Sequence, residues 1–161
     1  MVKLSDFLEI NLLEPDIQAS NMADCLRMIV ILLARYQAIQ DPTEVLEKLL
    51  EREKVMSTGI GAGIAIPHAR CASLNKTIVC IALSKDGIDF NSLDGDPVKM
   101  VFLLLGPQDS STLHVRLLAQ IAKMIKDREF IERLRNASTP EEMMKLVKGQ
   151  ELKELKEDGV E

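Results

Sequence analysis

Two histidines carry the clearest chemical potential in this chain. His68 follows the glycine-rich segment 57–63 and the dipeptide Ile66–Pro67. Imidazole titrates near physiological pH, so a neutral ring is available as a nucleophile. Proline fixes its own φ and biases the preceding residue towards extended backbone, which stiffens the approach to His68. We interpret His68 as a candidate nucleophile for phosphoryl transfer. The alternative is a purely structural role, which is more common for a single histidine after a strand.

His114 lies in a different setting, just inside an expected helix that follows the hydroxyl-bearing residues Ser110, Ser111 and Thr112. A helix N-terminus presents unpaired N–H groups and a partial positive charge, which together stabilise a dianionic phosphoryl group. An imidazole at this place could donate a hydrogen bond to phosphate oxygens. The sequence alone favours the simpler alternative, in which His114 is an ordinary polar residue of a first helical turn.

Arg52 is the third candidate, because a guanidinium offers a fork of donors that fits phosphate oxygens. It lies between Glu51 and Glu53, so it could equally be a solvated helix charge in a salt-bridge network, and its spacing does not decide between the two. The glycine segment lacks the Gly-Lys-Ser/Thr of a nucleotide-binding loop. No Cys, Asp or Glu stands at metal-ligand spacing around the histidines, so no metal is expected.

Composition limits the class of protein. The chain has 161 residues, enough for one domain, and only 3% of them are aromatic, so the core must be aliphatic. Its net charge of −5 argues against non-specific nucleic-acid binding. The three cysteines form no CxxC pair, and no signal peptide is apparent, which indicates a reducing cytoplasm. The longest apolar run, near 28–34, is too short to cross a bilayer, so no membrane insertion is expected.

Apolar periodicity predicts the elements that must position these residues. Ser20 is a candidate N-cap for the first helix, and Asp41–Pro42 is a strong start for the second. Asp86–Gly87 predicts a hairpin turn into a strand over 88–90. The expected helices span 21–37, 42–54, 112–126, 127–136 and 140–148, and the expected strands span 64–67, 77–83 and 98–105. Short links between the middle strands favour a mixed sheet covered by helices, in a single domain over 1–150 with a frayed tail over 151–161.

One stretch resembles a known family closely. Residues 50–70 read LEREKVMSTGIGAGIAIPHAR, similar to the fructose/mannitol-type enzyme IIA family (type 2) of the phosphoenolpyruvate-dependent phosphotransferase system. The resemblance places the family's phosphorylated histidine on His68 and its active-site arginine on Arg52. The run Thr112–Ala119 (TLHVRLLA) places its second histidine on His114. The family often has glycine after the phosphorylated histidine, where this chain has Ala69.

The resemblance also implies a fold and a function. The fold would be α/β, a mixed five-stranded-type sheet sandwiched by helices. His68 would accept phosphate from a phosphorylated HPr-type carrier, or a nitrogen-branch paralogue, and pass it to a cysteine of an enzyme IIB domain, with no cofactor beyond the covalent phosphoryl group. The stand-alone length is closer to nitrogen-regulatory IIA proteins than to sugar-uptake ones, and a non-catalytic binding module with the same fold is the alternative.

Two further expectations concern the surroundings of His68. We expect Ser57, Thr58 and Gly59 to contribute to the phosphate environment. Because His68 would meet two protein partners in turn, we also expect an exposed apolar rim near it, with Met56, Ile60 and Ala62 as candidates.

Overall fold

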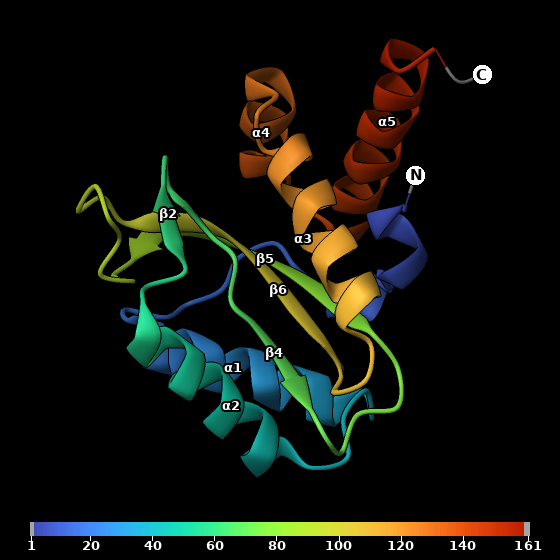
Figure 1. Cartoon of the computed structure of the whole chain (residues 1–161). Coiled ribbons are helices and arrows are strands. Elements are labelled where there is room, and N and C mark those ends of the chain that lie inside the picture. The colour runs from blue at the N-terminus through green and yellow to red at the C-terminus, as the bar shows by residue number, and fades with distance from the viewer. Residues whose placement is uncertain (1, 160–161) are drawn as a thin grey trace.

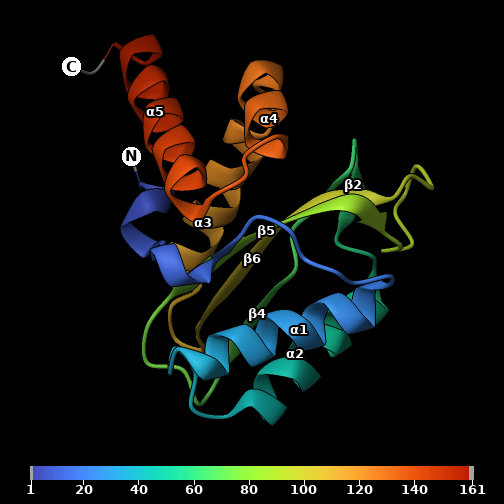
Figure 2. The ribbon, with the colours of Figure 1, turned by 180° about the vertical axis from the view of Figure 1, so that it is seen from behind.

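The computed structural model describes residues 2–159 and has a mixed sheet with helices on both faces (Figure 1). Two helices cover one face, α1 (Met22–Arg35) and α2 (Pro42–Val55). Three cover the other, α3 (Ser111–Met124), α4 (Arg128–Arg135) and α5 (Pro140–Glu157). Figure 2 shows the same layers from behind, with α1 and α2 together below the sheet. The predicted α/β sandwich is therefore confirmed.

The sheet has six strands within the described residues, where a five-stranded type was expected. Five follow one another in the order β1 (Leu13–Glu14), β5 (Ile78–Ile88), β6 (Val98–Pro107), β3 (Ile64–Ala65) and β2 (Gly59–Gly61). The sixth, β4 (His68–Cys71), pairs with β6 in parallel. Two short 3₁₀ helices, η1 (Leu4–Phe7) and η2 (Ile10–Leu12), precede β1.

Strand β6 divides the core into two halves. Val101, Leu103 and Leu105 pack towards α1 and α2, while Phe102 and Leu104 pack towards α3, α4 and α5. Successive residues of a strand face opposite sides, so a strand buried on both faces needs an uninterrupted apolar run. The sequence of β6 supplies one, which is why its prediction succeeded. The buried cysteines Cys25 and Cys80 belong to the half beneath α1 and α2.

The strand predicted over 64–67 is divided by Pro67. Ile64 and Ala65 of β3 pair with Met100 and Val101, and His68 resumes pairing beside Leu104 as the first residue of β4. Pro67 has no N–H to donate, so one bond of the ladder is missing there, although its carbonyl oxygen still accepts from Leu104 N at 2.9 Å. His68 is thus fixed by β6 directly, instead of lying in a loop past a strand.

Two local predictions were wrong. Gly87 lies inside β5, with φ of 86° and a register shift between Leu83 and Ile88, so Asp86–Gly87 is a bulge and the expected hairpin does not form. A Cβ at Gly87 would lie 2.7 Å from Pro97 Cβ, which explains the glycine. The N-cap of α1 is Asn21, whose side chain accepts from Asp24 N at 2.9 Å, and not Ser20. The predicted Asp41–Pro42 start of α2 is confirmed.

The C-terminal segment is also different from its prediction. Helix α5 continues to Glu157, whereas the sequence predicted an end near 148 and a frayed tail from 151. Glu151 and Glu154 are each 2% exposed; Glu151 accepts from Ser5 N at 3.3 Å, and Glu154 accepts from Gln120 Nε2 at 2.8 Å. These contacts are polar, so a search for apolar periodicity does not register them. Val160 and Glu161, the end of the predicted tail, lie outside the described residues.

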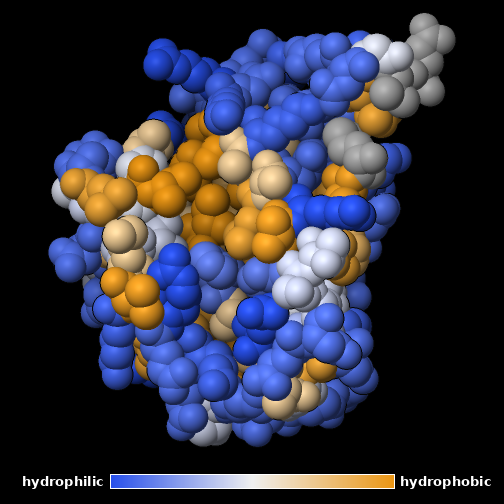
Figure 3. All heavy atoms as spheres, in the orientation of Figure 1, coloured by the Kyte–Doolittle hydropathy of each residue, from blue (hydrophilic) through white to orange (hydrophobic). Residues whose placement is uncertain are grey.

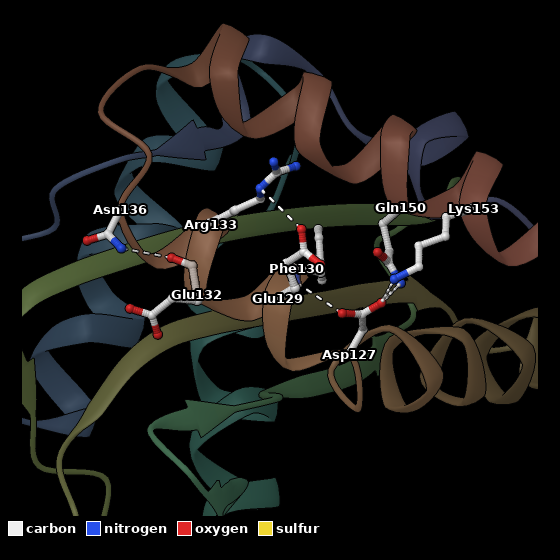
Figure 4. Close-up of polar contacts among 8 residues, drawn as sticks. All are labelled: Asp127, Glu129, Phe130, Glu132, Arg133, Asn136, Gln150 and Lys153. Atoms are coloured by element: carbon white, nitrogen blue, oxygen red, sulfur yellow. Dashed lines mark hydrogen bonds and ion pairs between the residues drawn. The ribbon is translucent and has the colours of Figure 1, made fainter.

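Asp127 fastens this extended helix to the start of α4. Its carboxylate caps α4 by accepting from Phe130 N at 3.2 Å, and it also accepts from Lys153 Nζ at 2.7 Å and Gln150 Nε2 at 3.1 Å (Figure 4). These bonds, led by that from Lys153, lower the pKa of Asp127 to about 2. None of the helices in residues 2–159 has both the length and the apolar character needed for a bilayer crossing.

Candidate active site

A pocket of about 670 Å³ brings the three main candidate residues together. The wall of the pocket is made by side chains from one face of α2, from the first three residues of β4, and from the first and middle turns of α3. The lining residues are Lys48, Glu51, Arg52, His68, Ala69, Arg70, Gln108, His114 and Leu118. Figure 1 shows β4 between α2 and the start of α3, the three elements that supply these side chains. His68, His114 and Arg52 thus converge, as the sequence predicted.

The His68 ring is held by a backbone carbonyl two residues earlier in the chain. Its Nδ1 lies 2.8 Å from the carbonyl oxygen of Ile66, a residue whose N–H bonds to Thr58 O on the side away from β6. A carbonyl oxygen only accepts, so Nδ1 carries the proton and donates it. In a neutral ring this leaves the lone pair on Nε2. Burial lowers the pKa of His68, and the charge of Arg52 lowers it further, so the neutral, nucleophilic ring is favoured.

His114 lies beside it, with ring centroids 5.6 Å apart and the planes tilted by 55°. His114 is only 7% exposed, and burial, together with the neighbouring titratable ring of His68 and the positive charge of Arg70, lowers its pKa to about 4. Its Nδ1 is buried beside Gly106 and has no hydrogen-bond partner among the described residues. Nε2 is therefore the nitrogen that can serve the pocket, as a neutral donor.

The pocket is cationic although the whole chain is acidic. Arg52 comes from the last turn of α2 and donates from Nη1 to Met56 O at 2.8 Å, which holds the guanidinium against the loop after α2. Lys48 pairs with Glu51 at 3.8 Å. Among the described residues, neither Arg52 nor Arg70 pairs with a carboxylate. Two guanidinium groups without a carboxylate partner beside a neutral imidazole form an anion-binding environment.

Arg70 and Gln108 are among the lining residues that the sequence interpretation did not identify, as is Lys48. Arg70 follows His68 by two residues in one strand, so the two side chains share a face. The alternation is visible in the burial, because Ala69 and Cys71 between and after them are in the core. Once β4 is known to begin at His68, this period of two is enough to find Arg70. No local pattern marks Gln108, which reaches the pocket through the turn between β6 and α3.

The structure places Ser57, Thr58 and Gly59 elsewhere. Ser57 Oγ donates to Phe90 O at 2.6 Å and accepts from Gly59 N at 3.0 Å. Thr58 is buried, and both its N–H, at 3.1 Å, and its hydroxyl bond to the carboxylate of Glu53. None of the three lines the pocket around His68. Their polar groups are used to fold the loop after α2, so the expected phosphate environment is not found at these residues.

Ala69 is explained by its place in β4. It is buried and pairs with Leu105, and its φ is not in the left-handed region. Glycine is required only where φ is positive or where a Cβ would collide. The alanine at this position therefore leaves the geometry of His68 intact.

Chemically, the pocket can hold and transfer a dianionic group. It offers a nucleophilic Nε2, an adjacent neutral imidazole donor and two guanidinium groups that pair with no carboxylate in residues 2–159. Phosphoryl transfer needs little covalent chemistry from a protein beyond a positioned nucleophile and preorganised charge.

Comparison with known proteins agrees with this chemistry. The chain is 39% identical over 122 residues to a nitrogen regulatory protein of Pseudomonas aeruginosa, covering 76% of this chain and 79% of that one. Its fold is similar to the crystal structure of the nitrogen regulatory protein IIA-Ntr from Neisseria meningitidis (TM-score 0.83, 27% identity, 89% of this chain and 98% of that one). It is also similar to enzyme IIA in the mannitol IIA–phosphorylated IIB complex of Escherichia coli (TM-score 0.75, 21% identity, 88% and 97%).

The match to a family model covers most of the chain. The profile described as "Phosphoenolpyruvate-dependent sugar phosphotransferase system, EIIA 2" matches residues 6–150, which include every lining residue of the pocket and nine-tenths of the chain. The chain belongs to the EIIA 2 family of the phosphoenolpyruvate-dependent sugar phosphotransferase system.

Proposed function

We propose that His68 is a phosphoryl acceptor and donor. In the first step the lone pair of Nε2 attacks the phosphorus of a phosphohistidine on a carrier protein of the HPr type or its nitrogen-branch paralogue. The new N–P bond forms as the carrier's N–P bond breaks, and the carrier's ring nitrogen takes back that electron pair. The proton on Nδ1 stays bonded to Ile66 O throughout, so the transfer needs no proton movement at His68.

The second step reverses the roles. A thiolate of an enzyme IIB domain attacks the phosphorus, an S–P bond forms, and the electron pair of the broken N–P bond returns to Nε2 of His68. His114 and Arg52 stabilise the equatorial oxygens in both steps, because charge on those oxygens persists along a loose transition state. No cofactor takes part, and the phosphoryl group on His68 is the only covalent intermediate.

The observation that carries the proposal is the Nδ1–Ile66 O contact beside His114. It combines the correct tautomer of the nucleophile with an adjacent donor, in a pocket whose two guanidinium groups bond to backbone carbonyls and have no carboxylate partner within the described part of the chain. A merely structural histidine would not need a second buried imidazole 5.6 Å away or a cationic surrounding.

The surface beside the pocket is suited to protein partners. Figure 3 shows an apolar area on this face, between β2 and the helices α3 and α4. It includes a hollow lined by Ile60, Ala62, Leu93 and Ile125, of which Leu93 is 73% exposed and Ile60 46%. Ile125 is the C-cap of α3 and lies seven residues after Leu118 of the His68 pocket, so both face the same side of that helix. Met56, Ile60 and Ala62 are exposed, as predicted, although none of them lines the His68 pocket, and we assign this area to partner docking.

Two uses of the phosphoryl group remain distinct. In the regulatory use, which we favour, the phosphorylation state of His68 decides which target protein is bound, and the similarity to nitrogen regulatory proteins supports it. In the transport use the group goes on to a IIB cysteine. Phosphoryl transfer from the labelled protein to a IIB domain, measured against hydrolysis alone, separates the two.

The test of the acceptor role is direct. Incubation with phosphoenolpyruvate, enzyme I and HPr should give an acid-labile, base-stable phosphoryl label on the wild-type protein and none on His68→Ala. Label that persists on His68→Ala would contradict the assignment. Wild-type protein that stays unlabelled with both carriers would favour the alternative, a binding module that keeps the fold without the chemistry.

A further inference from the structure

Arg70 occupies a place beside His68 that the proposed mechanism has not yet used. It lies two residues further along β4, on the same face, and it lines the same pocket. Its side chain is exposed, so it is free to turn. Its positive charge is also among the causes that lower the pKa of His114, so it acts on the interior of the pocket.

The guanidinium of Arg70 is only partly engaged. Its Nη1 donates to the carbonyl oxygen of Gln108 at 3.1 Å, and it has no carboxylate partner among the described residues. A guanidinium has five N–H donors. Most of its donor capacity is therefore available to solvent and to the pocket that His68 also lines.

The acceptor that Arg70 holds belongs to an exposed turn. Gln108 and Asp109 are exposed, and the turn is closed by Ser110 N and Ser110 Oγ, which both donate to Pro107 O, at 3.2 and 2.8 Å. This turn leads directly into α3, which carries His114. The hydrogen bond from Arg70 to Gln108 O thus connects β4, the strand of His68, to the turn that leads into α3, the helix of His114.

We propose that Arg70 is a third phosphoryl-binding residue beside Arg52 and His114, and that it leaves Gln108 O when His68 is phosphorylated. A guanidinium and a phosphoryl dianion carry opposite full charges and often form two parallel hydrogen bonds, whereas Gln108 O is a neutral carbonyl that accepts one bond, so Arg70 should prefer the phosphoryl oxygens. The exposed turn 107–110 then loses the hydrogen bond that connects it to Arg70. A partner that contacts this turn can distinguish the two states of the protein without touching the phosphoryl group.

This inference rests on the proposed phosphorylation of His68, and nuclear magnetic resonance tests it on the full chain. The carbonyl ¹³C shift of Gln108 reports the bond that its oxygen accepts. In wild-type protein it should move on phosphorylation to the value found in unphosphorylated Arg70→Gln, and in Arg70→Gln it should not move further. Arg116→Gln is the matched control, because Arg116 is an exposed arginine of α3 that lines a different hollow. It should behave as wild type.

The rate of phosphoryl acceptance gives the second readout. Arg70→Gln should slow labelling by HPr about tenfold, and Arg70→Lys, which keeps the charge but loses the fork, should fall between Arg70→Gln and wild type. Both variants change an exposed side chain, and an unchanged thermal midpoint confirms that they fold. A labelled wild-type protein whose Gln108 carbonyl shift does not move overturns the inference while leaving the role of His68 intact. Wild-type protein that takes no label overturns both.

Discussion

The Nδ1 atom of His68 lies 2.8 Å from the carbonyl oxygen of Ile66, two residues earlier in the chain. The N–H of Ile66 bonds to Thr58 O on the side away from β6, so the carbonyl oxygen of Ile66 also points away from β6 and can accept from the ring. This contact sets both the direction of the ring and the nitrogen on which the lone pair resides. The residue before the proline, which the sequence indicated to be stiff and extended, thus also supplies the acceptor for His68.

The first prediction concerns the phosphorylated atom. Because Nδ1 keeps its proton on Ile66 O, the phosphoryl group should be found on Nε2. The ¹⁵N spectrum of the phosphorylated protein, in which only the phosphorylated nitrogen couples to ³¹P, measures this. Coupling to Nδ1 would show that the ring turns before transfer and that the Ile66 contact does not set the tautomer.

The second prediction concerns the neighbouring ring. His114→Gln keeps a neutral donor of smaller reach, whereas His114→Ala removes the donor. Loss of one preorganised donor to developing charge costs on the order of 10²-fold in rate, so His114→Ala should still accept phosphate from HPr, but slowly. His114→Gln should recover part of the rate. A wild-type rate for His114→Ala would return His114 to the role of an ordinary residue of a first helical turn.

The third prediction is a pH dependence of stability. The pKa of His114 is about 4 in the folded protein, whereas the ordinary value of 6.5 applies in the unfolded chain. Between pH 4 and 6.5 the unfolded chain therefore binds more protons than the folded protein. Stability contributed by neutral His114 is therefore complete above pH 6.5 and is lost as the pH falls towards 4. The lowered pKa of His68 acts in the same direction. Urea unfolding at several pH values should show this decline, and His114→Gln should show a weaker one.

The success of sequence interpretation here depended on how local the determining interactions are. Neighbouring residues alone determine the buried apolar run of β6 and the Asp41–Pro42 start of α2, and both were predicted. The Asp86–Gly87 bulge looks like a hairpin turn locally, and only its contact with Pro97 and the pairing of Ile88 with Val98 show that the strand continues. Convergence of His68 and His114 from two distant elements required the family resemblance, because spacing alone does not bring them together.

A specific local motif can also mislead about the role of its residues, as at Ser57, Thr58 and Gly59. They belong to the most specific motif of the chain, yet the structure uses them to build the loop after α2, where the buried Glu53 accepts from Thr58. That carboxylate lies one residue from Arg52, whose guanidinium is bonded to Met56 O in the same loop. A motif can thus be specific for a function while most of its residues serve the shape of the site.

The fourth prediction tests this structural reading. Thr58→Val removes a hydroxyl from a buried carboxylate and should lower the free energy of unfolding by about 1–3 kcal/mol, since a buried acceptor loses a partner. Saturating rates of phosphorylation should stay near those of wild type at a temperature where the variant is folded. Thr58→Ser keeps the hydroxyl and is the control. A large loss of rate in Thr58→Val with stability unchanged would restore Thr58 to the phosphate environment.

The fifth prediction concerns the end of α5. Truncation after Gln150 removes the carboxylates that bind Ser5 N and Gln120, and the amine that binds Asp127. Hydrogen bonds to charged groups contribute about 1.5–3 kcal/mol each, and these are coupled, so a loss of at least about 2 kcal/mol in unfolding free energy is expected. Removing only 158–161 should cost less, because among these residues Asp158 makes one exposed pair, with Lys123 at 2.7 Å. Equal stability of the two truncated chains would mean that residues 151–157 add nothing, as a frayed tail would.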